Sequence, residues 1–264
     1  MVNLSLNMRN EQVGRGLDWH TPTSLPALEA GQAHVWRVRL EAWREQGDLR
    51  AILTEDEIAR AQRLRIPEKR ADFVTARAAL RTVLASYIGL TPRQVELAYL
   101  PDGKPQLADP LMAARLQFNL SHSGEWMLLA LSRGLPLGVD IERIHPLRAQ
   151  GWALAQLFNR AEREVLNTVP QAYREAAFIA AWTLKEAVGK ADGRGIRAQA
   201  DTTDLLQAWF SQDEAQPYRY GKLAGYSIAQ FNPAPGYCAA LALAAVQPVQ
   251  LRFLNLEKAR IETV

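Results

Sequence analysis

The sequence predicts an α+β protein built from two similar halves. Its 264 residues are enough for one large domain or for two small, closely packed ones. A strand pattern, two helix patterns and several further strand patterns follow one another in the first part of the chain. When the chain is compared with itself at an offset of 105 residues, the second part repeats this order. Matching element order and spacing therefore favour a duplicated architecture.

The first half is expected to open with a strand and two helices. The segment HVWRVRL alternates apolar and polar residues as a strand does. Thr54 stands at an N-cap position before the acidic first turn of LTEDEIARAQRL, which predicts a helix. Pro67 begins a second, longer helix that is expected to stop near Gly89. After it, VELAYL, LQFNLS and EWMLLALS are expected to be strands, and PDGKPQL a turn.

The 105-residue offset places these segments on their counterparts in the second half. HVWRVRL falls on VDIERIH, LTEDEIARAQRL on FNRAEREVLNTV, and FVTARAALR on FIAAWTLKE. In this register Glu57 pairs with Glu162, whereas Arg81 corresponds to Glu186. Few residues are identical between the two halves in this register, so the prediction of a duplication rests on the order of the elements. Equivalent positions are basic in one half and acidic in the other, and a site is expected between the halves.

Four segments follow from this pattern. Residues 1–33 show no sustained periodicity and are expected to form an extended or partly disordered N-terminal arm. Residues 34–135 form the first α+β half, residues 136–247 the second, and residues 248–264 a C-terminal tail.

Composition limits the classes of function. No apolar run of about 18 residues is present, which argues against a membrane span, and the first residues lack the apolar core of a secretion signal. A cytoplasmic protein is expected. The net charge of +3 is too small to indicate nucleic acid. The single cysteine, Cys238, lies in an apolar run, which excludes an internal disulfide and predicts a buried residue.

LGVDIERI reads as a short strand with two acids on one face. Side chains alternate along a strand, so Asp140 and Glu142 point to one side and Val139 and Ile141 to the other. Two adjacent carboxylates repel each other, and a divalent cation is a common reason to keep them together. An edge strand with a solvated acidic face is an equally good interpretation of this stretch alone.

A helix in the second half offers a third carboxylate. In AAWTLKEAVGKADGRG, Trp182, Glu186 and Lys190 are spaced by four and share one face, whereas Lys185 points away. The simpler interpretation is an exposed Glu–Lys pair beside a packed tryptophan. Alternatively, Glu186 completes a magnesium site with the two strand carboxylates, and Lys190 meets a phosphate oxygen.

Other polar residues suggest a phosphate-bearing ligand. Ser121 and His122 precede a strand, where an exposed imidazole could hold a phosphate or an adenine edge. Lys104 in the turn DGKP could reach a phosphate. Arg77 and Arg81 lie four apart among apolar residues and indicate a phosphate-rich ligand. The chain has no G-x-S-x-G, G-x-G-x-x-G or Walker sequence, so hydrolase, Rossmann and P-loop interpretations lack support.

Four motifs of the chain together resemble a known family, the Sfp-type 4′-phosphopantetheinyl transferases. In chain order they are GKP, FNLSHS, LGVDIE and WTLKEAVGKADGRGI, and the resemblance covers residues 34–245. The W-x-x-K-E-A form is similar to members that serve polyketide, peptide or fatty-acid synthesis. The resemblance implies two α+β halves about a pseudo-twofold axis, with the site between them. It also implies transfer of the phosphopantetheine arm of coenzyme A to a serine of an apo acyl carrier protein or peptidyl carrier domain, by a monomer that uses Mg²⁺ or Mn²⁺.

Site residues carry over from the motifs position by position. Asp140, Glu142 and Glu186 match the metal ligands of the family, and Glu186 also matches the proposed general base. Lys190 would balance charge on the phosphoryl group, so Glu186, Lys190 and Asp140 are the expected catalytic residues. The expected coenzyme A contacts are Arg60, Arg77, Lys104, Ser121, His122 and Lys190. Glu57 stands where some relatives carry lysine, so Arg60 is the first choice for the phosphate and Arg77 the second.

Two other functional classes compete with this one. A magnesium-dependent nuclease also uses D-x-E on a strand, but its lysine would lie on the acidic strand rather than on a helix. A non-catalytic module that binds carrier proteins or nucleotides would be expected to have lost one of the carboxylates or the lysine, and all are present.

Overall fold

The computed structural model describes residues 17–45, 47–101, 103–145, 154–195, 201–211, 218–223 and 225–257. The first half contains β1 (Gln32–Arg39), α1 (Leu40–Arg44), α2 (Glu55–Gln62), α3 (Pro67–Ile88), β2 (Leu97–Tyr99), β3 (Pro105–Leu107), α4 (Pro110–Arg115), β4 (Leu116–Ser123) and β5 (Trp126–Arg133). The second half contains β6 (Leu137–Arg143), α6 (Arg160–Thr168), α7 (Arg174–Asp192), α8 (Thr203–Ser211), β7 (Tyr218–Leu223), β8 (Tyr226–Phe231) and β9 (Tyr237–Leu243). The strand β10 (Gln250–Asn255) follows.

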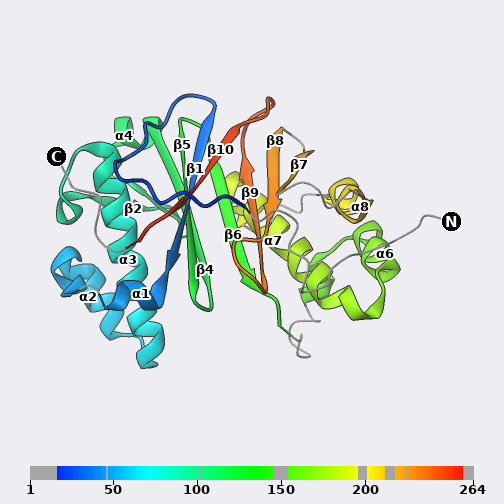
Figure 1. Cartoon of the computed structure of the whole chain (residues 1–264), viewed down its shortest axis with the longest axis horizontal. Helices are drawn as coiled ribbons and strands as arrows, with labels where there is room; N and C mark the ends of the chain where they lie inside the picture. Colours follow the sequence, from blue (N-terminus) through cyan, green and yellow to red (C-terminus); the bar gives the residue numbers. More distant parts are fainter. Residues whose placement is uncertain are drawn as a thin grey trace.

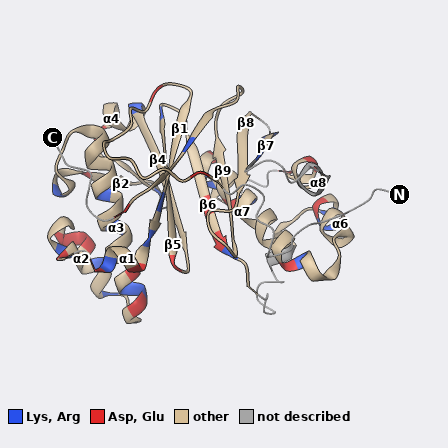
Figure 2. Cartoon of the chain, viewed as in Figure 1, with Lys and Arg blue, Asp and Glu red and all other residues tan. Residues whose placement is uncertain are grey.

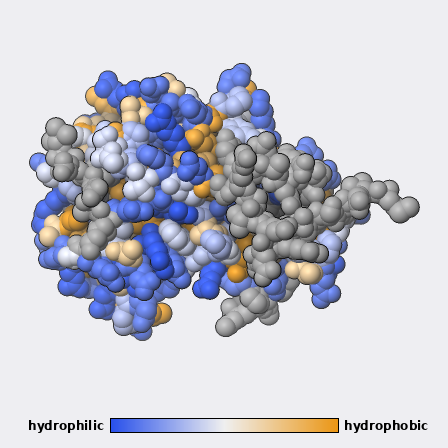
Figure 3. Space-filling model, in the orientation of Figure 1, coloured by the Kyte–Doolittle hydropathy of each residue, from blue (hydrophilic) through white to orange (hydrophobic). Residues whose placement is uncertain are grey.

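Two four-stranded sheets form the centre of the molecule (Figure 1). The first has the order β10-β1-β5-β4 and the second the order β6-β9-β8-β7, while β2 and β3 pair separately. One apolar cluster lies between the first sheet and α3, a second joins the two sheets, and a third lies between the second sheet and α7. Charged residues are frequent along α1 and α2 and also occur on the strands (Figure 2), and the part of the surface that is not grey in Figure 3 is largely hydrophilic with small apolar areas. The α+β class is confirmed.

The three pairings of the 105-residue offset are confirmed as a strand and two helices in each half. The first helix of each pair also begins in the same way. Thr54 and Glu57 form a capping box at the start of α2, and Asn159 and Glu162 form one at the start of α6. In each box the glutamate is buried. The long helix of the first half starts at Pro67 and ends at a left-handed Gly89, as expected.

The C-terminal tail does more than follow the second half. Its strand β10 pairs in parallel with β1, so residues that were expected to lie outside both halves complete the first sheet. Residues 1–16 of the expected N-terminal arm lie outside the described residues, and its last two residues belong to β1. Near the start of the described chain, Trp19 packs edge-on against Phe253 of β10 with 5.2 Å between ring centroids. The pairing covers an edge of β1 that would otherwise expose unpaired backbone groups. A second small difference is that β4 continues to Ser123 instead of ending before His122.

None of the described helices is both long and apolar enough to cross a membrane. The prediction for Cys238 is confirmed. Its thiol is buried, and burial raises its pKa to about 12, so it is protonated and unreactive at neutral pH.

His34 should make the free energy of unfolding depend on pH, with lower stability in acid. It is fully buried between β1 and α3, its Nδ1 lies 2.5 Å from the Tyr87 hydroxyl, and burial together with Arg252 lowers its pKa to about 4. The unfolded chain therefore binds this proton first as the pH falls from 6.5 towards 4. We expect a loss of up to about 3 kcal/mol of unfolding free energy over this range.

Urea unfolding at pH 7.5 and 4.5 measures this effect. His34→Gln should show a smaller difference between the two pH values than the unsubstituted chain, whereas His20→Gln, at an exposed position, should show the same difference. An unchanged difference in His34→Gln would contradict the assignment.

Candidate active site

The acidic strand β6 lies where the second sheet meets the first. Val139 and Ile141 belong to the apolar cluster between the sheets, so the predicted alternation is confirmed. Asp140 is only 3% exposed, which rules out a solvated acidic face. Gly138 explains why β6 can lie so close to α7: a Cβ there would collide with the main chain of Ala187 and Ala191.

Alternate residues of β4 bind β6 through their side chains. Asn119 Oδ1 accepts a hydrogen bond from the backbone N–H of Val139 at 2.9 Å. Ser121 Oγ donates to Asp140 Oδ1 at 2.8 Å, and Ser123 Oγ donates to Glu142 Oε2 at 2.7 Å. Sequence reasoning selected Ser121 but not Asn119 or Ser123. The period of two in FNLSHS places all three on one face and is the signal that could have found them.

The helix α7 contributes a positively charged side chain, Lys190, to the site. Lys190 Nζ donates to Asp140 Oδ1 at 2.7 Å, to Ser121 Oγ at 3.2 Å and to the carbonyl of Val139 at 3.2 Å. Trp182, Glu186 and Lys190 are all half-buried on one face of α7, as their spacing predicted.

Lys185 points away from this face. Its Nζ pairs with Glu162 Oε1 at 2.9 Å. The simpler interpretation of the helix, an exposed pair between Glu186 and Lys190, is wrong, because Lys190 pairs with Asp140 instead.

Each carboxyl group at this point has a raised pKa. For Asp140 the main cause is burial, which Lys190 and Ser121 oppose. Burial also raises the pKa of Glu142, and Asp140 adds to this effect. The pKa of Glu186 is raised by burial and then by Asp140. The fold thus holds three acids where their negative charge is poorly stabilised, an arrangement typical of functional sites.

One oxygen of this group lacks a partner. Asp140 Oδ2 is buried and has no hydrogen bond, which leaves an acceptor available to a cation. Within the described ranges, no three His, Cys, Asp or Glu side chains are gathered closely enough to hold a metal ion. The three-carboxylate metal site therefore stays a prediction.

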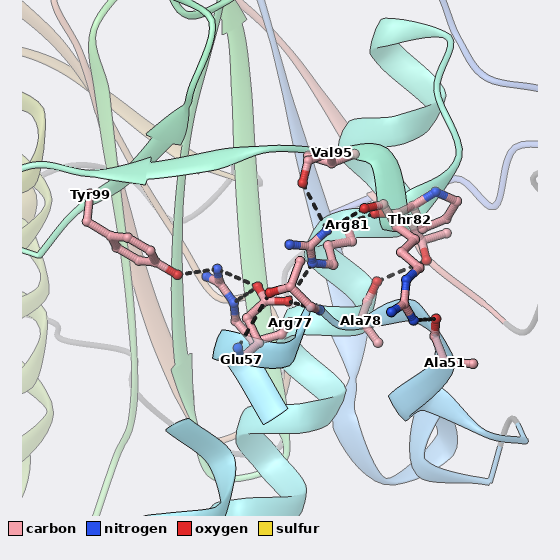
Figure 4. A network of polar contacts seen from close by, with 11 residues as sticks. Ala51, Glu57, Arg77, Ala78, Arg81, Thr82, Val95 and Tyr99 are labelled. Atoms are coloured by element: carbon pink, nitrogen blue, oxygen red, sulfur yellow. Dashed lines mark hydrogen bonds and ion pairs between the residues drawn. The ribbon is translucent and has the colours of Figure 1, made fainter. Parts of the chain in front are cut away.

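The arginines of the first half form a network around Glu57 (Figure 4). Arg77 Nε donates to Glu57 Oε1 at 2.8 Å and Arg81 Nε donates to Glu57 Oε2 at 2.6 Å. Burial alone would raise the pKa of Glu57, but Arg81 and Arg77 outweigh it and lower that pKa. Arg77 and Arg81 are 6% and 2% exposed, so both charges are directed inward.

Arg60 lies on the outside of this network. It is exposed, and its guanidinium lies 5.6 Å from the ring centroid of Phe73 and 5.7 Å from that of Tyr99. Arg77 donates to the hydroxyl of the same tyrosine at 2.6 Å. Arg60 is therefore the arginine of this group that is open to an anion.

The remaining predicted contacts, His122 and Lys104, have different neighbours. His122 lies near Lys69 and Asp72 of α3 and is exposed on its outer side. The pKa of its imidazole is lowered, chiefly because part of the ring is buried. Lys104 Nζ donates to the carbonyls of Leu137 at 3.0 Å and of Lys190 at 2.7 Å. The structure thus brings Ser121, Asp140 and Lys190 into direct contact, while Lys104 contacts the main chain of Lys190.

Comparison with known proteins gives two adjoining family matches. Residues 136–242 match the 4′-phosphopantetheinyl transferase superfamily, and residues 35–133 match the N-terminal domain of a 4′-phosphopantetheinyl transferase.

Individual proteins agree with these matches. The chain is 33% identical to the 4′-phosphopantetheinyl transferase HetI of Nostoc sp., over 84% of this chain and 92% of HetI. It is 30% identical to the 4′-phosphopantetheinyl transferase psf-1 of Bacillus pumilus, over 56% of this chain and 61% of that protein. It is also 27% identical to a phosphopantetheinyl transferase of Thraustochytrium sp., over 75% and 72% of the two chains.

Proposed function

Because the chain belongs to the 4′-phosphopantetheinyl transferase superfamily, we propose that it moves the phosphopantetheine arm of coenzyme A to a serine of a carrier protein. The acceptor is an apo acyl carrier protein or a peptidyl carrier domain, and the enzyme acts as a monomer in the cytoplasm. The observation that carries the proposal is the buried Asp140, bound by Lys190 and Ser121, with Glu142 and Glu186 beside it.

In this reaction the serine oxygen forms a bond to the β-phosphorus of coenzyme A. The bond between that phosphorus and the bridging oxygen of the diphosphate breaks, and adenosine 3′,5′-bisphosphate leaves. The serine proton passes to Glu186, directly or through water. A raised pKa suits this carboxyl group for accepting a proton near neutral pH, since it brings the group closer to the working pH.

We propose a magnesium ion at these carboxyl groups, with Asp140 as its first ligand. Mg²⁺ commonly takes one or two protein carboxylates and leaves its other positions to water and substrate phosphates. Asp140 offers an unpartnered buried oxygen for this purpose. Asp140, Glu142 and Glu186 would hold the ion, which when bound neutralises charge on the diphosphate. Lys190 would then place its ammonium against the phosphoryl oxygens, and Ser121 would keep Asp140 oriented.

The first half supplies groups for the nucleotide. Arg60 is exposed and supported by two aromatic rings, which suits a phosphate, whereas the charge of Arg77 is already paired with Glu57. His122, whose pKa is lowered chiefly by burial, offers an imidazole near Lys69 of α3. We therefore assign the 3′-phosphate to Arg60 first, with Arg77 as its neighbour in the network.

An acidic carrier protein would meet a basic surface at the junction of α2 and α3. Arg63, Arg65 and Lys69 are exposed there, and Ile66 between them is 57% exposed. Complementary charge of this kind raises the rate of association and makes it sensitive to salt.

The test is an intact-mass spectrum of a purified apo-carrier protein after incubation with this protein, coenzyme A and Mg²⁺. We expect a gain of one phosphopantetheine group that disappears when EDTA is added. Acyl and peptidyl carriers are both tested. No gain with either, while coenzyme A still binds, would overturn the transferase proposal in favour of a binding module.

A further inference from the structure

Lys104 connects the two halves of the molecule. It lies in the turn before β3 of the first half, and its ammonium binds two main-chain carbonyls of the second half. One is Leu137, the first residue of β6, and the other is Lys190 in the last turn of α7. Two of the three N–H donors of Lys104 are engaged by these carbonyls.

The two carbonyls bound by Lys104 lie beside a close approach of β6 and α7. Gly138 follows Leu137 directly, and its missing side chain leaves room for the backbone of α7. Carbonyls in the last turn of a helix lack intrahelical partners and carry its negative partial charge. An ammonium group is a favourable partner for such a carbonyl, because it donates a hydrogen bond and has the opposite charge.

This contact acts directly on the site. Lys190 receives the hydrogen bond of Lys104 on its main chain and presents its own ammonium to Asp140 on its side chain. Leu137 lies three positions before Asp140 on the same strand. Lys104 therefore holds the two main-chain segments from which the Asp140–Lys190 pair extends.

We propose that Lys104 is a positioning residue of the transfer site rather than chiefly a ligand of a coenzyme A phosphate. It holds β6 and α7 at the separation at which Asp140 and Lys190 meet. The inference rests on the proposed function for its consequence in catalysis, but the contact itself can be measured in the substrate-free chain.

The experiment compares Lys104→Met, which keeps an unbranched stem without N–H donors, with Lys104→Arg, which restores donors. Lys222→Met, at an exposed position of β7, is the matched control. For Lys104→Met we expect kcat to fall about 10- to 100-fold, because small displacements of catalytic groups have effects of this size. The KM for coenzyme A should change less than about threefold, and Lys104→Arg should recover part of kcat.

Hydrogen exchange in the absence of coenzyme A and carrier protein provides the second readout. Amides of β6 and of the last turn of α7 should exchange faster in Lys104→Met, and should be unchanged in Lys222→Met. If Lys104→Met does not fold, Lys104→Gln takes its place: its uncharged amide on a shorter stem weakens the contact without removing every donor, so smaller changes in kcat and exchange, in the same direction, are expected.

A large rise in the KM for coenzyme A with unchanged kcat and exchange would overturn the inference and make Lys104 a phosphate ligand. Unchanged kcat, KM and exchange would overturn it as well. If the unsubstituted chain modifies no carrier protein, the proposed function fails, and exchange alone decides whether Lys104 holds β6 against α7.

Discussion

Asp140→Asn is expected to lower kcat/KM for carrier modification by about 10²- to 10³-fold, the loss typical of removing one major electrostatic contact from an active site. Asparagine has nearly the same shape and can still accept hydrogen bonds from Lys190 and Ser121, so the local structure should persist. It lacks the negative charge that would bind Mg²⁺ through the buried oxygen Oδ2. The loss should therefore come from the metal and the transferring phosphate rather than from unfolding.

Steady-state rates from intact-mass spectra, at several Mg²⁺ concentrations, measure this effect. Asp56→Asn, at an exposed position in the first turn of α2, is the control and should retain full activity. Calorimetric titration with Mg²⁺ and coenzyme A should show weaker metal binding in Asp140→Asn. Full activity in Asp140→Asn would remove this residue from the catalytic site.

Among the substitutions proposed for this chain, Glu57→Gln is expected to cause the largest loss of stability, about 3–5 kcal/mol of unfolding free energy. Glutamine can still occupy the N3 position of a capping box, so the start of α2 is preserved. The substitution removes a carboxylate that pairs with both Arg77 and Arg81, which are only 6% and 2% exposed. Two buried guanidinium groups would then lack their counter-charge.

Urea unfolding at pH 7 tests this prediction. Glu164→Gln removes an exposed carboxylate paired with Arg160, and it should change the free energy of unfolding by no more than about 0.5 kcal/mol. Because the pKa of Glu57 is lowered in the fold, its contribution is present above the ordinary value of 4.5 and is lost as the pH falls through the lowered value. A loss below about 1 kcal/mol in Glu57→Gln would show that the arginines are stabilised by other partners.

Local patterns in the sequence were sufficient to identify the elements of the site and the faces of its residues. Alternation placed Asp140 and Glu142 on one side of a strand, and spacing by four placed Glu186 and Lys190 on one side of a helix. Both patterns depend only on the repeat of the local backbone, which is the same in every strand or helix. The repeat of 105 residues likewise placed a second helix at FNRAEREVLNTV, and the structure shows that this helix starts at a capping box formed by Asn159 and Glu162.

Such patterns did not determine which partner each charged side chain contacts. Arg77 and Arg81 looked like a phosphate site, but α2 packs beside α3 and presents Glu57 to both. Lys104 lay in an ordinary turn, yet that turn reaches across to β6 and α7. These partners are 20 or more residues away in the chain, so no local repeat connects them.

The sequence by itself determined the class of fold, the motifs and the side on which each candidate residue lies. Only the tertiary structure decided that β10 would close the edge of β1 and that Ser121, Asp140 and Lys190 would meet. The physical reason is that periodicity is a property of a few neighbouring residues. Contacts between distant segments depend on which strand edges remain open and on how closely the packed layers approach.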